Sequence, residues 1–238
     1  MKHYIITLVV LGFYQHAIAQ SNTGIPIRWL DDSPVVQPVG LSWGMPWPRG
    51  TVKKDHSFSL TDAMGKNVPL QSWTTAYWPD GSVKWSGFAA VAGTSNGALQ
   101  LGVSTTKPIA TTSALVVTDK GETVTINTGA LRCVIRRKGN FLIDSLLVEN
   151  RLVASSGRLE AILQQGPDGE EFESPAKEKF TSRITSVTVE QTGPVRSVVK
   201  VDGKMQSAKA TREWLPFSIR LYFYAGSQAV RLVNTIIY

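Results

Sequence analysis

The sequence has few of the residues from which metal centres and acid–base sites are usually built. It contains one cysteine, Cys133, and three histidines, of which His56 alone lies beyond residue 16. A single thiol cannot form an internal disulfide, and zinc sites built from cysteine and histidine clusters have no ligands here. We therefore expect a fold stabilised by its core alone, with Cys133 buried in the alternating strand pattern of Leu131, Cys133 and Ile135.

Catalytic machinery is also hard to find. Glycine-rich phosphate loops are absent, and a serine triad would have to use His56, which we interpret as a surface residue beside Asp55. A glycosidase needs two neighbouring carboxylates, and nothing in the spacing of the acidic residues brings two together. No cofactor is evident from the sequence, and a divalent cation such as calcium stays open. The candidate carboxylates are scattered along the chain: Asp80, Asp144, Glu160 and Glu213.

Residues 1–19 have the composition of a secretory signal peptide. Lys2 and His3 form a short positive start, and Tyr4–Phe13 is an apolar stretch within the range of about 7–15 residues that export signals use. A membrane-spanning helix needs about 20 apolar residues, and no segment of the chain reaches that length. Because Ala17-Ile18-Ala19 fits a small-x-small cleavage site, we expect the mature chain to begin at Gln20. The protein is then exported, to a bacterial periplasm, to the cell surface or into the medium.

The chain is basic, with a formal charge of +7 that falls to +6 once Lys2 is removed with the signal. A basic exported protein favours acidic partners. An anionic polysaccharide or an anionic membrane surface fits that expectation, whereas nucleic acid is not expected as a partner outside the cytoplasm. Ordinary solubility charge is the alternative explanation. The sequence does not determine the oligomeric state.

Helical periodicity is nearly absent, and short alternating runs broken by Gly, Pro, Asn and Asp indicate antiparallel strands. The clearest run is Phe217–Tyr224, where every second residue is apolar and Arg220, Tyr222 and Tyr224 share the opposite face. A second strand, Ala229–Tyr238, returns beside it. Further strands are predicted at Val35–Leu41, Ser57–Thr61, Ser72–Trp78, Val83–Val91, Leu115–Thr118, Thr123–Asn127, Leu131–Arg136, Arg158–Gln164, Ile184–Glu190 and Val198–Val201.

Turn residues divide the chain. Pro79–Ser82 and Ala225–Gln228 are predicted turns, and Asp202-Gly203 is predicted as a two-residue hairpin turn. The Thr- and Ser-rich segment Ser104–Ser113 reads as a linker between two β units, and Gly166–Lys179 reads as a long surface loop. The last strand ends without a closing partner, and such an open edge suggests a piece of a longer protein.

Aromatic and cationic residues are the best candidates for a binding site. Seven tryptophans are present, five of them between Trp43 and Trp85. Flat rings can pack against sugar rings, and the arginine fork matches a uronate carboxylate. Packing is the alternative for each, because tryptophan also fills cores and tyrosine is common on sheets. The candidate binding residues are Trp43, Trp47, Arg49, Trp78, Lys84, Arg220 and Tyr222.

Four segments carry a family resemblance: Gly44–Gly50, Gln71-Ser72-Trp73, Tyr77–Trp85 and Gly193-Pro194-Val195-Arg196. They resemble the exo-rhamnogalacturonan lyase-like proteins, over nearly the whole mature chain. The resemblance implies an all-β fold: a RIFT-type β-barrel in residues 20–112, then an incomplete antiparallel β-sandwich in residues 113–238. In that family an α/α toroid follows, for which this chain has no counterpart.

The implied chemistry is β-elimination at a uronic acid of pectic rhamnogalacturonan, so the implied partner is an acidic plant cell-wall polysaccharide or oligosaccharide. In such a reaction a cation neutralises the carboxylate and a base removes the neighbouring proton. Arg49, Lys84, Arg220 and Arg231 have the charge for neutralisation, but the resemblance assigns no catalytic residue. Two alternatives stay open: a non-catalytic carbohydrate-binding module, and a structural β protein or inactive fragment.

Overall fold

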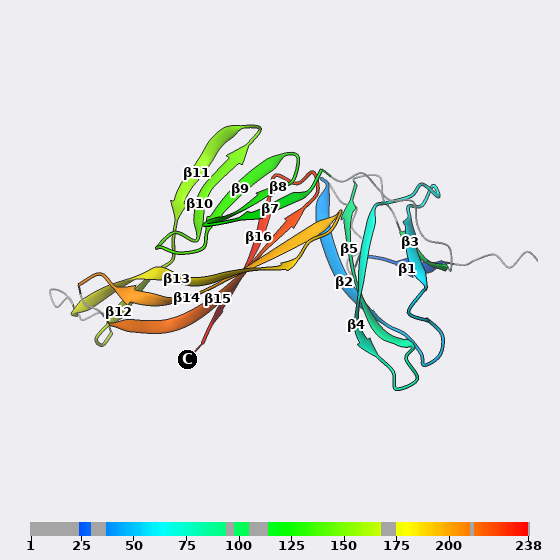
Figure 1. Cartoon of the computed structure of the whole chain (residues 1–238), viewed down its shortest axis with the longest axis horizontal. Helices are drawn as coiled ribbons and strands as arrows, with labels where there is room; N and C mark the ends of the chain where they lie inside the picture. The colour runs from blue at the N-terminus through cyan, green and yellow to red at the C-terminus, as the bar shows by residue number, and fades with distance from the viewer. Residues whose placement is uncertain are drawn as a thin grey trace, which may run out of the picture.

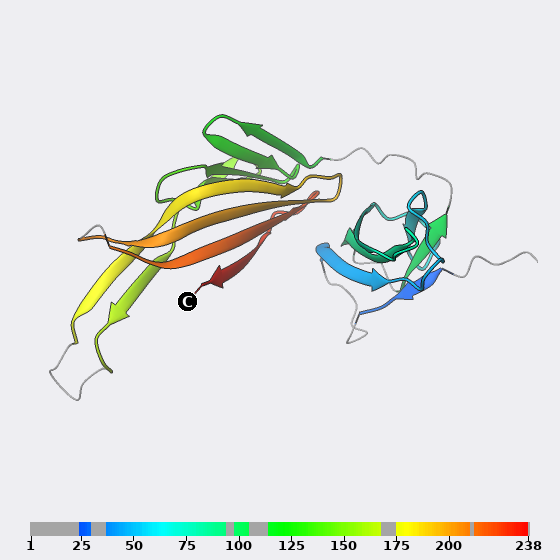
Figure 2. The same cartoon turned by 60° about the horizontal axis from the view of Figure 1, so that its bottom comes forward.

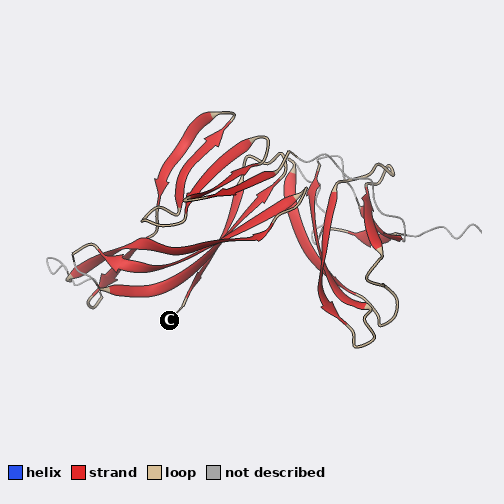
Figure 3. Cartoon of the chain, in the orientation of Figure 1, coloured by secondary structure: helices blue, strands red, loops and turns tan. Residues whose placement is uncertain are grey.

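The computed structural model describes residues 24–29, 37–93, 98–104, 114–167, 175–209 and 212–237. Within these ranges the chain forms sixteen strands, and no helix (Figure 3). The all-β prediction is therefore confirmed. The predicted signal peptide and most of the predicted linker lie outside the described residues, as does the centre of the predicted loop at Gly166–Lys179.

The first unit is a small barrel made from two three-stranded antiparallel sheets, ordered β1-β6-β3 and β2-β5-β4. In Figure 1 it lies to the right of the second unit, with β2 on the side facing it. Its strands are β1 (Ile25–Ile27), β2 (Val39–Pro46), β3 (Ser57–Thr61), β4 (Leu70–Tyr77), β5 (Val83–Ala92) and β6 (Leu99–Ser104).

The second unit is a sandwich of two five-stranded antiparallel sheets, ordered β11-β10-β9-β8-β7 and β12-β13-β14-β15-β16 (Figure 2). Each strand in these sheets pairs with its neighbour in sequence. The strands are β7 (Val116–Lys120), β8 (Thr123–Asn127), β9 (Leu131–Arg136), β10 (Ile143–Val148), β11 (Arg151–Gly157), β12 (Glu160–Gln164), β13 (Lys177–Gln191), β14 (Arg196–Ser207), β15 (Glu213–Tyr224) and β16 (Val230–Ile236).

Four aromatic rings run through the barrel core. Trp43 stacks on Phe88 with ring centroids 5.4 Å apart, and Phe88 meets the edge of Phe58 at 5.0 Å. Phe58 then stacks on Trp47 at 5.5 Å. Offset and edge-to-face pairs of this kind add about 0.5–1.5 kcal/mol each beyond the burial of their area. The rings fill the space between the two small sheets together with the buried leucines Leu60, Leu99 and Leu101.

The sandwich core follows the alternation read from the sequence. Phe217, Ile219, Leu221 and Phe223 are all buried on one face of β15. Cys133 is fully buried in β9, as predicted, and joins the same core. Burying such side chains contributes about 25 cal/mol per Å² of apolar surface. At the edge the pattern changes, because β16 is exposed on nearly every residue.

The prediction of a hairpin turn at Asp202-Gly203 is wrong. β14 continues through both residues, and Gly203 pairs with Phe217 on β15. A side chain at Gly203 would lie 2.4 Å from the Phe217 ring and 2.4 Å from the backbone oxygen of Arg183. The glycine therefore allows neighbouring groups to approach the strand closely. The turns at Pro79–Ser82 and Ala225–Gln228 are confirmed, with Gly81 and Gly226 at positive φ.

Candidate functional site

Two of the family-like segments interlock as neighbouring loops at one end of the barrel. The backbone N–H of Trp47 donates to the Lys84 carbonyl at 2.9 Å, and Trp78 Nε1 donates to the Trp47 carbonyl at 3.0 Å. The Gly50 N–H donates to Ser82 Oγ at 2.9 Å. Because each loop satisfies polar groups of the other, the two segments hold one another in place.

Asp80 organises the second of these loops. Its Oδ1 accepts hydrogen bonds from the Ser82 hydroxyl at 2.6 Å and the Ser82 N–H at 3.0 Å. Its Oδ2 accepts from Arg49 Nε at 2.9 Å. These bonds, those of Ser82 first and that of Arg49 next, lower the pKa of Asp80 to about 2. Asp80 therefore stays ionised and fixes the exposed Arg49 beside the turn.

The outer face of β2-β5-β4 carries two tryptophans over glycines. Gly44 and Gly87 pair across β2 and β5. A side chain at Gly87 would lie 2.3 Å from the Trp73 ring, and one at Gly44 would lie 2.6 Å from Trp85 Nε1. Glycine at both positions lets the indoles lie close to the sheet. We call Trp73 and Trp85 the tryptophan platform; Trp85 is 42% exposed.

The other two family-like segments meet where the barrel contacts the sandwich. Gln71 Oε1 accepts hydrogen bonds from the backbone N–H groups of Val195 and Arg196, at 3.1 and 2.8 Å. A side chain at Gly193 would lie 2.3 Å from the Gln71 amide carbon. The glycine thus makes room for Gln71 to reach the sandwich backbone. Segments about 120 residues apart in sequence therefore form one contact.

Tyr224 adds an apolar part to the same contact. It packs with Ala89 and Val195, and its ring covers Gly40, where a side chain would lie 2.2 Å away. Its hydroxyl lies 2.7 Å from Ser42 Oγ. The barrel and sandwich are therefore joined by both apolar packing and buried hydrogen bonds.

Four side chains continue from this contact as a stack of alternating rings and guanidinium groups. The Arg196 guanidinium lies 4.3 Å from the Trp73 ring centroid and 5.6 Å from that of Tyr222. Arg231 lies 5.5 Å from the Tyr222 centroid. We call Trp73, Arg196, Tyr222 and Arg231 the junction stack. It begins on the barrel and crosses β14 and β15 to reach β16, where Arg231 is exposed.

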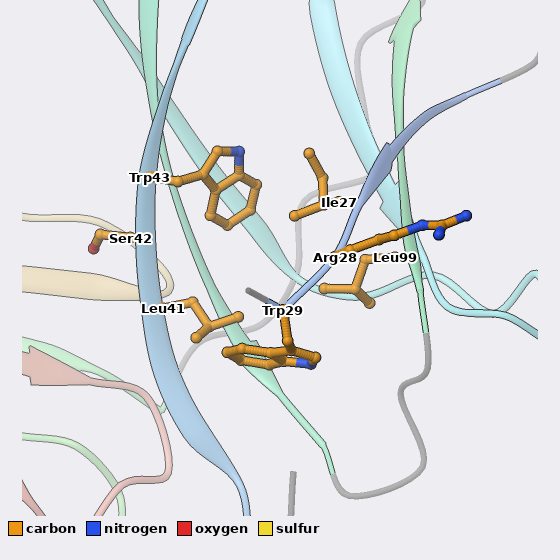
Figure 4. A pocket seen from close by; sticks show the side chains of 7 residues that line it. All are labelled: Ile27, Arg28, Trp29, Leu41, Ser42, Trp43 and Leu99. Carbon is orange, nitrogen blue, oxygen red and sulfur yellow. The ribbon is translucent and has the colours of Figure 1, made fainter. Parts of the chain in front are cut away.

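A separate pocket of about 160 Å³ opens on the inner side of β2 (Figure 4). The indoles of Trp29 and Trp43 line it together with Leu41 and two other aliphatic side chains. Arg28 extends away from the pocket in Figure 4. The Nε1 atom of Trp43 is a buried hydrogen-bond donor that has no acceptor among the described residues.

The candidate residues fall into four environments. Trp43 and Trp47 belong to the barrel core: Trp47 is 6% exposed, and its Nε1 donates to Ser86 Oγ at 3.0 Å. Arg49, Trp78 and Lys84 lie in the loop pair, where Lys84 Nζ is 4.6 Å from the Trp78 ring centroid. Tyr222 lies in the junction stack. Arg220, next to it on β15, makes two hydrogen bonds to Glu190 at 2.8 and 2.9 Å.

Four residues of the platform and the domain junction were not selected from the sequence: Gln71, Trp73, Trp85 and Arg196. All four stand in the family-like segments, but periodicity gives no sign that these segments meet. A useful signal was available in Gly87 and Gly193, since a glycine within or beside a strand often marks close approach by another group. Among the described residues, no group of three or more His, Cys, Asp and Glu side chains is placed to hold a metal ion.

The fold and these contacts define a two-domain all-β protein with a polar, aromatic junction between its domains. Residues 23–104 match the domain family described as PcRGLX-like N-terminal RIFT barrel domain, and residues 115–238 match the PcRGLX-like protein central beta sandwich domain. The chain belongs to this PcRGLX-like, exo-rhamnogalacturonan lyase-like family. The resemblance seen in the sequence is thereby confirmed.

A curated relative extends well beyond this chain. The Uncharacterized protein YetA of Bacillus subtilis (strain 168) is 37% identical over 209 residues, which cover 88% of this chain and 24% of the relative. The chain thus spans about a quarter of the length of the relative it matches. The part of the chain that the structure describes contains no helix long and apolar enough to cross a membrane.

Proposed function

We propose that this chain is a saccharide-binding part of an exported polysaccharide lyase-like protein, and that its ligand is an acidic polymer such as pectic rhamnogalacturonan. The family name supports the class of substrate. The leader-like first nineteen residues support export. The positive charge of the chain supports an anionic ligand, because opposite charge raises the local ligand concentration.

Trp85 is the observation that carries the proposal. Its indole is 42% exposed, although burying a tryptophan is normally favourable. The ring is held close to the sheet by Gly44, so it is already placed before a ligand arrives. Trp73 lies over the paired Gly87 and is covered on its other side by the Arg196 guanidinium at 4.3 Å, so the ring offered to the C–H face of a sugar is that of Trp85.

Two cations lie in the loop pair at the end of the barrel. Lys84 precedes Trp85 in sequence and lies over Trp78, while Arg49 is fixed by Asp80 in the same loop pair. Such side chains donate hydrogen bonds to carboxylate and hydroxyl oxygens. A sugar polymer that rests on Trp85 thus has donors close to the barrel end and at the junction.

The reaction proposed for the full-length protein is β-elimination. The proton beside the uronate carboxylate moves to a base, a carbon–carbon double bond forms, and the glycosidic carbon–oxygen bond breaks with protonation of the leaving oxygen. The contribution proposed for this chain is to bind and orient the polymer. Orientation by bound remote groups can lower a barrier substantially.

Binding is tested with Trp85→Ala and a rhamnogalacturonan oligosaccharide, measured by isothermal titration calorimetry. We expect about a tenfold or greater rise in Kd, because ring stacking is lost while the fold is kept. Leu152→Ala is the matched control. Leu152 is an apolar residue, 62% exposed, on the sandwich strand β11, and so it lies in a different domain from Trp85. Equal Kd values for wild type and Trp85→Ala contradict the proposal.

Cleavage is tested by following the ultraviolet absorbance of unsaturated uronates, with this chain and with the protein that extends through the rest of the family's length. Activity of the extended protein supports a lyase. Saturable binding with no unsaturated product in either form supports the non-catalytic binding module instead.

A further inference from the structure

Arg196 is a buried cation that has no acidic partner among the described residues. It is 8% exposed. Its Nε and Nη2 donate to Gln191 Oε1, at 3.0 and 2.5 Å, and Nη1 donates to Ser42 Oγ at 2.5 Å. All the acceptors are neutral. Together with the faces of Trp73 and Tyr222 they satisfy part of the guanidinium, but none of them cancels its charge.

Burying a charge is costly unless an opposite charge or strong hydrogen bonds compensate for it. Stacking on aromatic rings returns only a small part of that cost. A second guanidinium, that of Arg231, also contacts the Tyr222 ring, at 5.5 Å from its centroid. Like that of Arg196, it forms no ion pair in the described part of the chain. The junction stack therefore holds two positive charges and no negative one.

Two neighbouring cations on the same face of the sheet are neutralised. Arg220 is paired with Glu190 at 2.8 Å, and Lys200 with Asp202 at 3.1 Å. Both pairs lie close to the stack. Arg220 is two residues before Tyr222 on β15, and Lys200 is opposite Arg220 in the register of β14 and β15. Arg196 and Arg231 carry no ion pair in the described residues, and they lie at the place where the sandwich reaches the tryptophan platform.

A purely structural stack would explain Arg196, which joins the two domains. It does not explain Arg231, which is exposed at the far end of the stack and joins nothing to the barrel. An exposed guanidinium with free donors, backed by a second buried positive charge, is the arrangement that binds a carboxylate through a bidentate fork.

We infer that the outer end of the junction stack is a subsite for the carboxylate of a uronic acid residue. The carboxylate accepts hydrogen bonds from Arg231, and Tyr222 presents its ring edge and hydroxyl beside it. Arg196 acts as a positioning residue: it holds Tyr222 from the barrel side and adds positive charge. This inference rests on the proposed function, because it assigns one chemical group of the polymer to a particular place.

The test compares two probes that differ in the charge of their carboxyl groups: a rhamnogalacturonan oligosaccharide and the same oligosaccharide with its carboxylates methyl-esterified. Kd is measured by calorimetry for wild type, Arg231→Gln and Arg231→Lys. We expect Arg231→Gln to weaken binding of the acidic probe about tenfold, with little change for the ester. Arg231→Lys should recover part of the loss, since the charge returns without the fork. Arg151→Gln, an exposed arginine on β11, is the matched control.

Arg196→Lys tests the buried end. We expect a near-normal unfolding midpoint, because the charge is kept, and weaker binding of the acidic probe, because lysine lacks the planar group that positions Tyr222. If this variant does not fold, the Arg231 variants decide the question. The inference is overturned if Arg231→Gln binds the acidic probe as wild type does, or weakens both probes equally. Loss of binding in Trp85→Ala together with normal binding in Arg231→Gln keeps the proposed function and rejects this subsite.

Discussion

Gln71 of the barrel accepts a hydrogen bond at 2.8 Å from the backbone N–H of Arg196 in the sandwich, and both groups are buried. The same oxygen accepts from Val195. One side chain therefore satisfies two main-chain donors of the other domain at the start of β14. The position of the sandwich relative to the tryptophan platform depends on a directional contact as well as on apolar packing.

Replacing Gln71 with Ala should destabilise the junction. Two buried N–H groups lose their acceptor, and each unsatisfied buried donor costs about 1–3 kcal/mol. The measurement is the free energy of unfolding from urea denaturation. Gln228→Ala is the control, because the Gln228 side chain is exposed and contacts Glu149. A Gln71→Ala protein as stable as this control would show that the two donors find other partners.

Truncation of Trp47 should mainly reduce stability, whereas truncation of Trp85 should mainly reduce saccharide binding. Trp47→Ala removes a ring from the barrel core and is expected to cost about 3–5 kcal/mol of stability. Trp85→Ala, at a position 42% exposed, should change stability by about 0.5 kcal/mol while reducing saccharide binding. Thermal unfolding of the two variants checks the stability difference. A mild effect of Trp47→Ala would mean that the core can collapse around the missing ring.

Acid should remove the contribution of Asp80. Its pKa falls from 3.8 to about 2 in the folded state, so the ionised form stabilises the fold above about pH 4, and that stabilisation is lost as the pH falls toward 2. The unfolding midpoint of wild type should exceed that of Asp80→Asn at neutral pH, and the two should converge in acid. A difference that does not change with pH would show that the charge of Asp80 is not responsible.

Cys133 should be unreactive until the protein unfolds. Burial raises the pKa of its thiol to about 12, so almost no thiolate forms near neutral pH. A maleimide probe should label it slowly in buffer and rapidly in denaturant. Fast labelling of the native protein would show that β9 opens readily.

Local pattern was sufficient for most of the sandwich. Alternation along Phe217–Tyr224 identified the buried face of β15, and β8 and β9 were predicted at the residues where they occur. Turn chemistry placed the bends at Gly81 and Gly226, because positive φ favours glycine. The same rule failed at Gly203, where a neighbouring ring, and not a turn, requires the small residue.

The sequence by itself determined the fold class, the family, and which segments are distinctive, since these follow from period-two alternation and from short strings of residues. The tertiary structure decided which tryptophan is a core residue and which is an exposed one. Trp47 and Trp85 stand in similar strings, but Trp47 is buried against Phe58, whereas Trp85 lies exposed over Gly44. It also decided that Arg196 is bonded to neutral Gln191 and Ser42 and to no acidic side chain of the described residues, because such contacts join residues far apart in the chain and local pattern does not encode them.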